Sequence, residues 1–309
     1  MFYLDFETGK NAIYGGWFFG GGGGGMPKGG LDVLESALTS GKIKVVAIDE
    51  FRPEDIIVTA SLVGSPSTGR DAVTPEHCRR AYSLFVDSYK SPINGIISNE
   101  TGAHSITNGW IAAAVNGLPM VDGACNGRAH PTGVMGAMSL DTKPGYQTLQ
   151  VAVGGTGSND LAMSATGSIA STSKLVREAS TLSGGFITVL RNPTDAAYVK
   201  ENGAIGALTV CAKIGELFLR NVHKPGKLLD GLHEMLNCRV LCRGMTEDFS
   251  LIAKGGFDLG SVKVRDGKKV LEVTFWNEYM TAEEDSERMA TFPDLIALLD
   301  AKSGMPLCS

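Results

Sequence analysis

The chain has 309 residues, enough for two domains or for one large domain with an appendage. Its net charge of −5 and its lack of a basic stretch argue against nucleic acid or an anionic membrane as a partner. No apolar run approaches the roughly 20 residues that a membrane-spanning helix needs. Asp5 and Glu7 stand where an export signal carries basic residues, and the six cysteines follow no disulfide spacing, so we expect a cytoplasmic protein with reduced thiols.

The first distinctive feature is a run of six glycines, residues 20–25, which precedes Pro27 and a helical pattern. Glycine destabilises regular elements but lets backbone N–H groups approach a bound group closely. Before a helix, such amides form a cradle for an anionic or polar group, so we predict that Gly22, Gly23 and Gly24 bind substrate. A flexible linker is the alternative. A nucleotide phosphate site is a third interpretation, although the run lacks the Lys and Ser or Thr of a P-loop.

Short β-branched runs then alternate with helical patterns. Predicted strands cover 44–48, 56–60, 93–98, 120–122, 149–153 and 185–190, and predicted helices cover 75–90, 110–115, 162–182 and 203–220. This alternation predicts an α/β fold with a mixed or largely parallel sheet and helices on both faces.

From about Cys238 the pattern changes to alternating strands, with Asp266-Gly267 as a hairpin turn. These strands cover 249–252, 261–264 and 270–275. We therefore predict an α/β body over residues 1–237 and a smaller β-rich C-terminal domain over residues 238–309.

Open α/β sheets bind ligands at the carboxyl ends of their strands. Four predicted strand-end loops combine glycine with polar residues, at 64–66, 100–108, 122–130 and 154–160. We expect these loops and the glycine run to meet in one cleft. The first and last of the loops contribute Ser65, Gly155 and Asn159 as predicted substrate-binding residues.

The two middle loops contain the residues best suited to acid–base chemistry. His104 and His130 lie in glycine-rich segments beside Glu100 and Asp122, and these four are the predicted catalytic residues. Two histidines and two carboxylates also suit a divalent metal ion that activates water. A hydrogen-bonded loop scaffold is equally compatible with this pattern, since the spacing matches no metal-binding motif.

Arg128 and Cys125 complete the set of candidate residues. An arginine among glycines typically meets a planar anion with both ends of its guanidinium, so Arg128 is predicted to bind a substrate carboxylate. A structural ion pair with Glu100 or Asp122 is the alternative. Cys125 is a nucleophile if the nearby cation lowers its pKa, or a small buried core residue if it does not.

The order of these loops resembles the S-methyl thiohydantoin desulfurase domain family. The resemblance covers nearly the whole chain and rests on many weak motifs in sequence rather than on one decisive motif. They are residues 20–25, 64–66, 100–102, 117–122, 127–129, 184–185, 191–193, 273–279 and 293–296. The resemblance implies an α/β body with a β-rich C-terminal domain, and it leaves open whether that domain is complete at Ser309.

The activity implied by the resemblance is hydrolytic removal of sulfur from a hydantoin- or thiohydantoin-type ring. We expect Glu100 or Asp122 to deprotonate water and His104 or His130 to protonate the leaving sulfur. Amides of the glycine run would stabilise the developing negative charge. The alternative is a non-catalytic ligand-binding or accessory subunit beside a hydantoinase-type partner. The edge at 276–279 and the small residues of 162–182 suggest a homo-oligomer.

Overall fold

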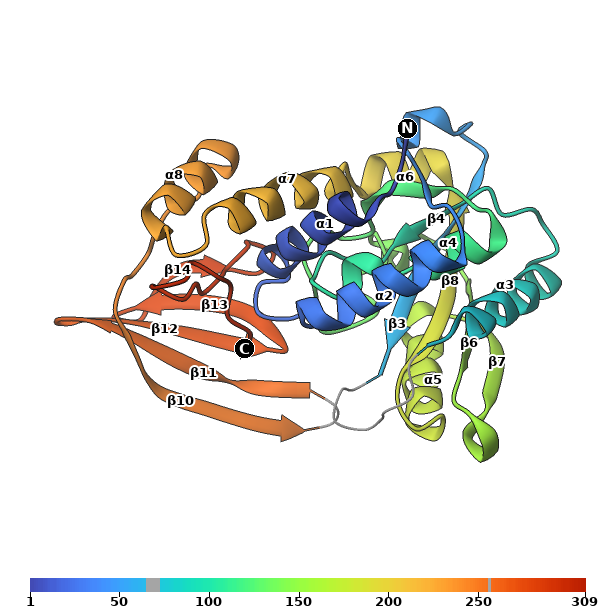
Figure 1. Ribbon diagram of the computed structural model, residues 1–309. Coiled ribbons are helices and arrows are strands. Elements are labelled where there is room, and N and C mark those ends of the chain that lie inside the picture. Colours follow the sequence, from blue (N-terminus) through green and yellow to red (C-terminus); the bar gives the residue numbers. More distant parts are fainter. Residues whose placement is uncertain (65–72, 255–256) are drawn as a thin grey trace.

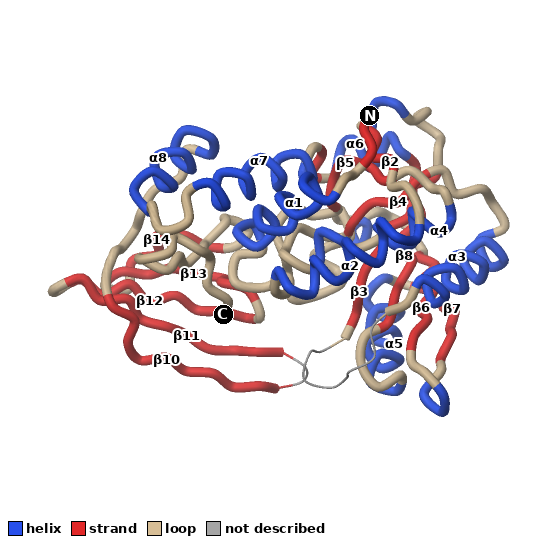
Figure 2. Tube along the Cα trace, in the orientation of Figure 1, coloured by secondary structure: helices blue, strands red, loops and turns tan. Residues whose placement is uncertain are grey.

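The computed structural model describes residues 1–64, 73–254 and 257–309. A large mixed sheet flanked by helices forms one side of the molecule, and a sheet of antiparallel strands forms the other (Figure 1, Figure 2). The large sheet contains, in spatial order, β1 (Phe2–Tyr3), β2 (Lys44–Val46), β5 (Met120–Ala124), β4 (Gly95–Ser98), β3 (Ile56–Val63), β8 (Ile187–Asp195), β6 (Thr148–Gly154) and β7 (Leu161–Gly167), while β9 (Ala204–Ile205) pairs with β5.

Within this sheet β2, β5, β4 and β3 run parallel to one another, and β8, β6 and β7 continue it in antiparallel pairs. The carboxyl ends of the parallel strands therefore share one edge, the usual ligand-binding edge of an open α/β sheet. At this edge an isolated parallel bridge between Thr101 and Arg128 joins the loops after β4 and β5. The predicted mixed sheet is confirmed.

Helices cover both faces of the large sheet, as the alternating pattern predicts. Side chains alternate between the faces of a strand, so the neighbours Ile57 and Val58 enter different hydrophobic cores. The core around Val58 packs on α1–α4, and the core around Ile57 packs on α5 and α6. The helices are α1 (Phe6–Phe19), α2 (Pro27–Ser40), α3 (Pro75–Tyr89), α4 (Trp110–Asn116), α5 (Ile169–Leu182), α6 (Ala196–Asn202), α7 (Ala207–Arg220) and α8 (Pro225–Leu236).

The second sheet is the predicted β-rich C-terminal part. Its strands, in sequence and spatial order, are β10 (Met245–Lys254), β11 (Phe257–Asp266), β12 (Lys269–Trp276), β13 (Glu278–Glu284) and β14 (Glu287–Thr291). Asp266 pairs with Lys269 across the predicted hairpin turn, where Gly267 takes a positive φ of 60°. Val273, Phe275 and Tyr279 form its own hydrophobic core with neighbours from the following segment.

One predicted element is wrong. The helix expected over 162–182 is divided into β7 and α5, with Ser168 as the N-cap of the helix. The side chains of β7 alternate between exposed and half-buried, which is the period of an edge strand. Small residues such as Ala and Ser carry too little hydrophobic signal to separate this period from that of a helix.

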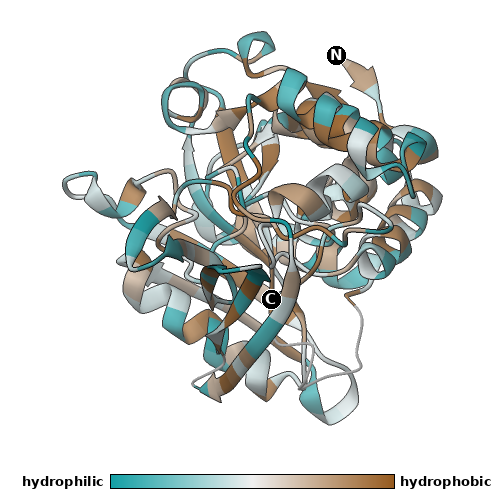
Figure 3. Ribbon diagram, turned by 90° about the vertical axis from the view of Figure 1, so that its left-hand side faces the viewer, coloured by the Kyte–Doolittle hydropathy of each residue, from teal (hydrophilic) through white to brown (hydrophobic). Residues whose placement is uncertain are grey.

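Apolar residues are concentrated toward the middle of the molecule, and hydrophilic residues are frequent at its outer turns (Figure 3). Across the described ranges, none of the helices has the length and apolar character required to cross a lipid bilayer.

Candidate functional site

The glycine run forms a tight turn between α1 and α2, and it lies against the second sheet. Gly21, Gly22 and Gly24 have φ values of +56°, +94° and +72°, which favour glycine over residues with a side chain. A Cβ atom on Gly21 would lie 2.6 Å from Nη2 of Arg128, and one on Gly23 would lie 2.1 Å from Oε1 of Glu278. The run is therefore a packed turn and not a solvated linker.

Hydrogen bonds from both parts of the chain hold this turn. The carbonyl of Gly21 accepts from the Tyr279 amide at 2.7 Å, and the carbonyl of Gly24 accepts from the amides of His104 and Ser105 at 2.9 and 3.1 Å. No described residue accepts a hydrogen bond from the amides of Gly22 and Gly24. The turn thus joins the loop after β4 to the second sheet and keeps free N–H donors.

Glu100 and His130 are in contact at the carboxyl edge of the large sheet. Nδ1 of His130 lies 2.9 Å from Oε2 of Glu100, and their side chains are only 2% and 12% exposed. The amide and hydroxyl of Thr101 both donate to the carbonyl of Gly127, at 2.7 and 2.8 Å, which fixes the two loops relative to each other. Gly136 covers the His130 ring, because a Cβ at that position would lie 1.9 Å from Nε2.

Glu278 brings a second carboxyl group to this region from the second sheet. It is the first residue of β13 and is 4% exposed. Burial raises the pKa of Glu278 well above its usual value, and the negative charge of Glu100 raises this pKa further, while Arg128 opposes the shift. Oε2 of Glu278 is buried and has no hydrogen-bond partner among the described residues. Burial of this carboxyl group therefore favours its neutral, protonated form.

Arg128 connects the glycine turn to the C-terminal part through backbone carbonyls. Nη1 donates to the carbonyl of Asp294, and Nη2 donates to the carbonyl of Tyr279 at 2.8 Å. Its guanidinium carbon lies 5.1 Å from the centre of the Phe292 ring. Both terminal nitrogens are thus used within the chain, and the binding of a substrate carboxylate by Arg128 stays a prediction.

The structure does not bring the other two predicted catalytic residues to this pair. His104 packs against Gly25 and Gly29, and burial lowers the pKa of its imidazole. Asp122 lies within β5, where one carboxylate oxygen accepts from the Thr209 amide at 3.0 Å and the other accepts from the Thr209 hydroxyl. Asp122 thereby binds the first turn of α7.

The remaining predicted site residues lie apart from the pair or outside the described structure. Gly155 and Asn159 lie in the β6–β7 hairpin, whose tip is far from the α1–α2 turn (Figure 1). Ser65 lies outside the described residues. Cys125 is fully buried, and burial raises the pKa of its thiol to about 12, which fits the interpretation of a core cysteine.

Sequence reasoning missed Glu278 as a site residue. Its one local signal is a carboxylate close to two aromatic residues, Trp276 and Tyr279, at the start of a strand. A metal centre finds no support, because nowhere in residues 1–64, 73–254 and 257–309 do three His, Cys, Asp or Glu side chains gather as ligands. The groups available for chemistry here are acids and bases.

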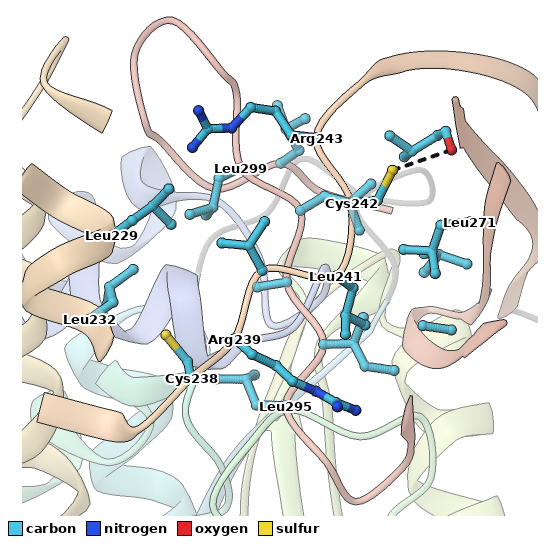
Figure 4. Close-up of a pocket in the computed structure, with 18 of the residues that line it drawn as sticks. Leu229, Leu232, Cys238, Arg239, Leu241, Cys242, Arg243, Leu271, Leu295 and Leu299 are labelled. Carbon is cyan, nitrogen blue, oxygen red and sulfur yellow. Dashed lines mark hydrogen bonds between the residues drawn. The ribbon is translucent and has the colours of Figure 1, made fainter. Parts of the chain in front are cut away.

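A cavity of about 770 Å³ lies between α8 and the second sheet, on the far side of the segment that binds Arg128. Its walls are mainly aliphatic, and Figure 4 shows leucines from α8 and from the second sheet pointing toward one another across it. Glu100, His130 and Glu278 are not among its lining residues. Sequence patterns did not predict this cavity.

Family models identify the chain. The model described as S-Me-THD-like, N-terminal domain, matches residues 10–165, and the model described as S-Me-THD-like, C-terminal domain, matches residues 168–309. A search of curated proteins finds no match. The crystal structure of a protein from Chromobacterium violaceum has the same fold, with a TM-score of 0.71 and 20% sequence identity over 99% of this chain and 84% of the other. The chain belongs to the S-Me-THD-like family and contains residues of both its domains.

Proposed function

We propose that this protein hydrolyses a hydantoin- or thiohydantoin-type ring and releases sulfur from it, with Glu100 and His130 as the base and Glu278 as the acid. One observation carries the proposal. Two carboxyl groups within electrostatic reach of each other have different environments: Glu100 is in contact with an imidazole, and Glu278 is buried with its Oε2 unpartnered among the described residues. Two neighbouring carboxyl groups held in different environments are suited to act as the acid and the base of a hydrolase.

The base in this proposal is the Glu100–His130 pair. Nδ1 of the imidazole is held by the carboxylate, as in sites where a carboxylate orients a histidine and stabilises its protonated form. A water molecule beside Glu100, the more exposed member of the pair, loses a proton to this carboxylate while its oxygen bonds to the ring carbon that carries sulfur, and His130 holds Oε2 of the carboxylate in place.

The acid is Glu278, whose burial raises its pKa and so favours the protonated form that a general acid needs. Its proton passes to the sulfur as the C–S bond breaks, so that sulfur leaves as a thiol, or as hydrogen sulfide from an unsubstituted thiocarbonyl. The ring carbon keeps the oxygen of water as a carbonyl group, and the second proton of that water moves from the added hydroxyl to the ring nitrogen, or to the leaving sulfur of a thiocarbonyl. The proton held by the Glu100–His130 pair then returns to Glu278, directly or through water, which restores the starting state.

The glycine turn supports the same step. The unpartnered amides of Gly22 and Gly24 are donors of the kind that stabilise negative charge on a tetrahedral intermediate. Gly23 between them lies against the Glu278 carboxyl group, so the turn and the acid are in contact. The predicted role of the glycine run in substrate binding is part of this proposal.

Turnover of S-methyl thiohydantoin, followed as release of methanethiol with a thiol-reactive dye, tests the proposal. We expect Glu278→Gln, Glu100→Gln and His130→Gln each to lower kcat by about 10² to 10⁴-fold, the usual contribution of a general acid or base. Glu287→Gln, at an exposed carboxylate of β14, is the matched control and should keep full activity. Wild-type activity in Glu278→Gln would contradict the assignment of the acid.

A ligand-binding or accessory role is the second candidate. One observation favours it: the terminal nitrogens of Arg128 and the carbonyls of the glycine turn form hydrogen bonds within the chain. These bonds indicate that the region also stabilises the fold. This role predicts that a thiohydantoin raises the melting temperature without product formation. It also predicts that the protein copurifies with a hydantoinase-type partner.

A further inference from the structure

Arg191 is a buried guanidinium without a hydrogen bond. It lies within β8 and is 4% exposed, and its neighbours in the sheet are Thr59 of β3 and Gln150 of β6. No described residue accepts a hydrogen bond from its side chain, and its Nε atom is fully shielded from solvent. A buried charge without partners is costly, so such a group normally has a counter-ion or a bound ligand.

Among the described residues, no anion is in contact with the Arg191 side chain. Cys125 is the nearest ionisable neighbour by electrostatic effect, but burial keeps its thiol protonated, and its sulfur lies 3.1 Å from the Thr59 hydroxyl. Glu100 also acts on Arg191 electrostatically, yet its carboxylate is paired with His130. Arg177 acts on Arg191 as a like charge, so no contacting anion among the described residues balances the positive charge, and Arg191 lies within electrostatic reach of Glu100 of the proposed catalytic pair.

Asn192 adds a second free donor next to Arg191. Its φ of +55° is unusual within a strand, and the pairing of β8 with β3 contains a bulge at this point. Oδ1 of Asn192 accepts from the Thr148 hydroxyl at 2.7 Å, but its buried Nδ2 has no partner. Thr148 and Gln150 share one face of β6, so the bulge presents Asn192 on the face occupied by Arg191.

Two further features describe the groups that surround these donors. Gly133 crosses over Arg191, since a Cβ at that position would lie 3.0 Å from Nη1. Oε1 of Gln150 is a buried acceptor without a partner, while its Nε2 donates to Thr172 and Ser173. A ligand here would meet several donors and one acceptor.

We propose that Arg191 and Asn192 bind the carboxylate of a small ring-containing ligand beneath the segment around Gly133. A guanidinium and a neighbouring amide N–H match the two oxygens of a carboxylate, and Gln150 Oε1 matches a ring N–H. The inference takes the type of ring from the proposed function. It then limits the expected substrates to those that carry an acidic substituent. Carboxylate binding itself is testable without turnover.

The experiment compares hydantoin-5-acetate with the neutral hydantoin-5-acetamide by calorimetry and thermal shift. We expect the wild-type protein to bind the acid about tenfold or more tightly than the amide, the difference expected for a hydrogen bond to a charged group. Arg191→Met should lose this preference. Because it removes a buried unpaired charge, it should also melt at or above the wild-type temperature without ligand.

Arg128→Met is the matched control, since that buried arginine donates to backbone carbonyls and its loss should lower the melting temperature. Gly133→Val offers a second test that leaves Arg191 in place, because a larger side chain fills the space over the guanidinium and should weaken binding of the acid. Equal binding of acid and amide, or a preference retained in Arg191→Met, would overturn the inference. So would destabilisation of Arg191→Met to the level of Arg128→Met.

The result also separates this inference from the proposed function. Tight binding of the acid without turnover of any thiohydantoin supports the carboxylate site and refutes hydrolysis. Turnover of a carboxylated thiohydantoin with an unchanged KM in Arg191→Met supports hydrolysis and refutes the carboxylate site.

Discussion

The carboxyl group of Glu278 lies directly against the α-carbon of Gly23, leaving no room for a side chain in the middle of the glycine turn. One residue belongs to the first turn of the α/β part and the other to the second sheet, so the contact joins the two parts of the chain. The turn is therefore rich in glycine for two reasons: several positions have positive φ, and this one must admit a buried acid.

Replacement of Gly23 tests this contact. A Cβ at Gly23 would lie 2.1 Å from Oε1 of Glu278, and the backbone at Gly23 has no positive φ that would add strain. We expect Gly23→Ala to displace the acid and to destabilise the fold by about 1–3 kcal/mol, as overpacking does in protein cores. Gly226→Ala in the first turn of α8, which has no atom within 4 Å, should be neutral or slightly stabilising. Equal urea midpoints for the two variants would rule out the contact.

The protonation of Glu278 should make stability depend on pH. Folding raises the pKa of this carboxyl group above the ordinary value of about 4.3, so the folded chain binds a proton that the unfolded chain releases. The stability from this proton is fully present below that value and is lost as the pH rises toward the folded pKa.

Glu278→Gln removes this titration while keeping the shape of the side chain. The variant should therefore gain in free energy of unfolding relative to wild type as the pH rises from 4 to 8, by up to about 1.4 kcal/mol per pH unit. Urea unfolding at several pH values measures the difference, with the exposed Glu287→Gln as the control for loss of one carboxyl group. A difference that stays constant with pH would show that Glu278 is ionised in the folded protein.

The architecture could be predicted from local patterns because each strand and helix carries its own hydrophobic period. The proximity of Glu100 and His130 could also be predicted, in one further step from the order of the strands. Both residues come after parallel strands, and the carboxyl ends of parallel strands share an edge. The other two predicted catalytic residues, His104 and Asp122, lie elsewhere. Their neighbours in the sequence resemble those of Glu100 and His130, so local patterns cannot tell the two pairs apart.

The sequence could not predict that Glu278 and Arg191 lie near the carboxyl edge of the large sheet. Glu278 arrives from a second sheet that is almost 180 residues further along the chain, and no local rule says where this sheet docks. Arg191 follows an apolar stretch of β8 and precedes polar residues of the same strand, a pattern that also fits a strand that becomes exposed toward its end. In both cases the useful sequence signal is a charged residue at a strand position where the alternation of buried and exposed side chains predicts a buried one.

Cys125 should be unreactive in the folded protein. Burial raises the pKa of its thiol to about 12, so almost none of it is thiolate at pH 8. We expect iodoacetamide to label the exposed Cys308 in the native state and to reach Cys125 only after unfolding. Peptide mapping by mass spectrometry after short exposures measures both rates. Rapid native labelling of Cys125 would restore its interpretation as a nucleophile.

Asp122 is expected to serve stability and not turnover. Its carboxylate accepts two hydrogen bonds from Thr209 in the first turn of α7, next to Gly206, the N-cap of that helix. Asp122→Ala should cost about 0.5–2 kcal/mol of stability, the usual range for the loss of such a contact, while kcat changes little. Asp87→Ala on the exposed side of α3 is the control and should stay within about 0.5 kcal/mol of wild type. If Asp122→Ala kept its unfolding midpoint but lost activity by two orders of magnitude, Asp122 would be catalytic and Glu100 would need a different role.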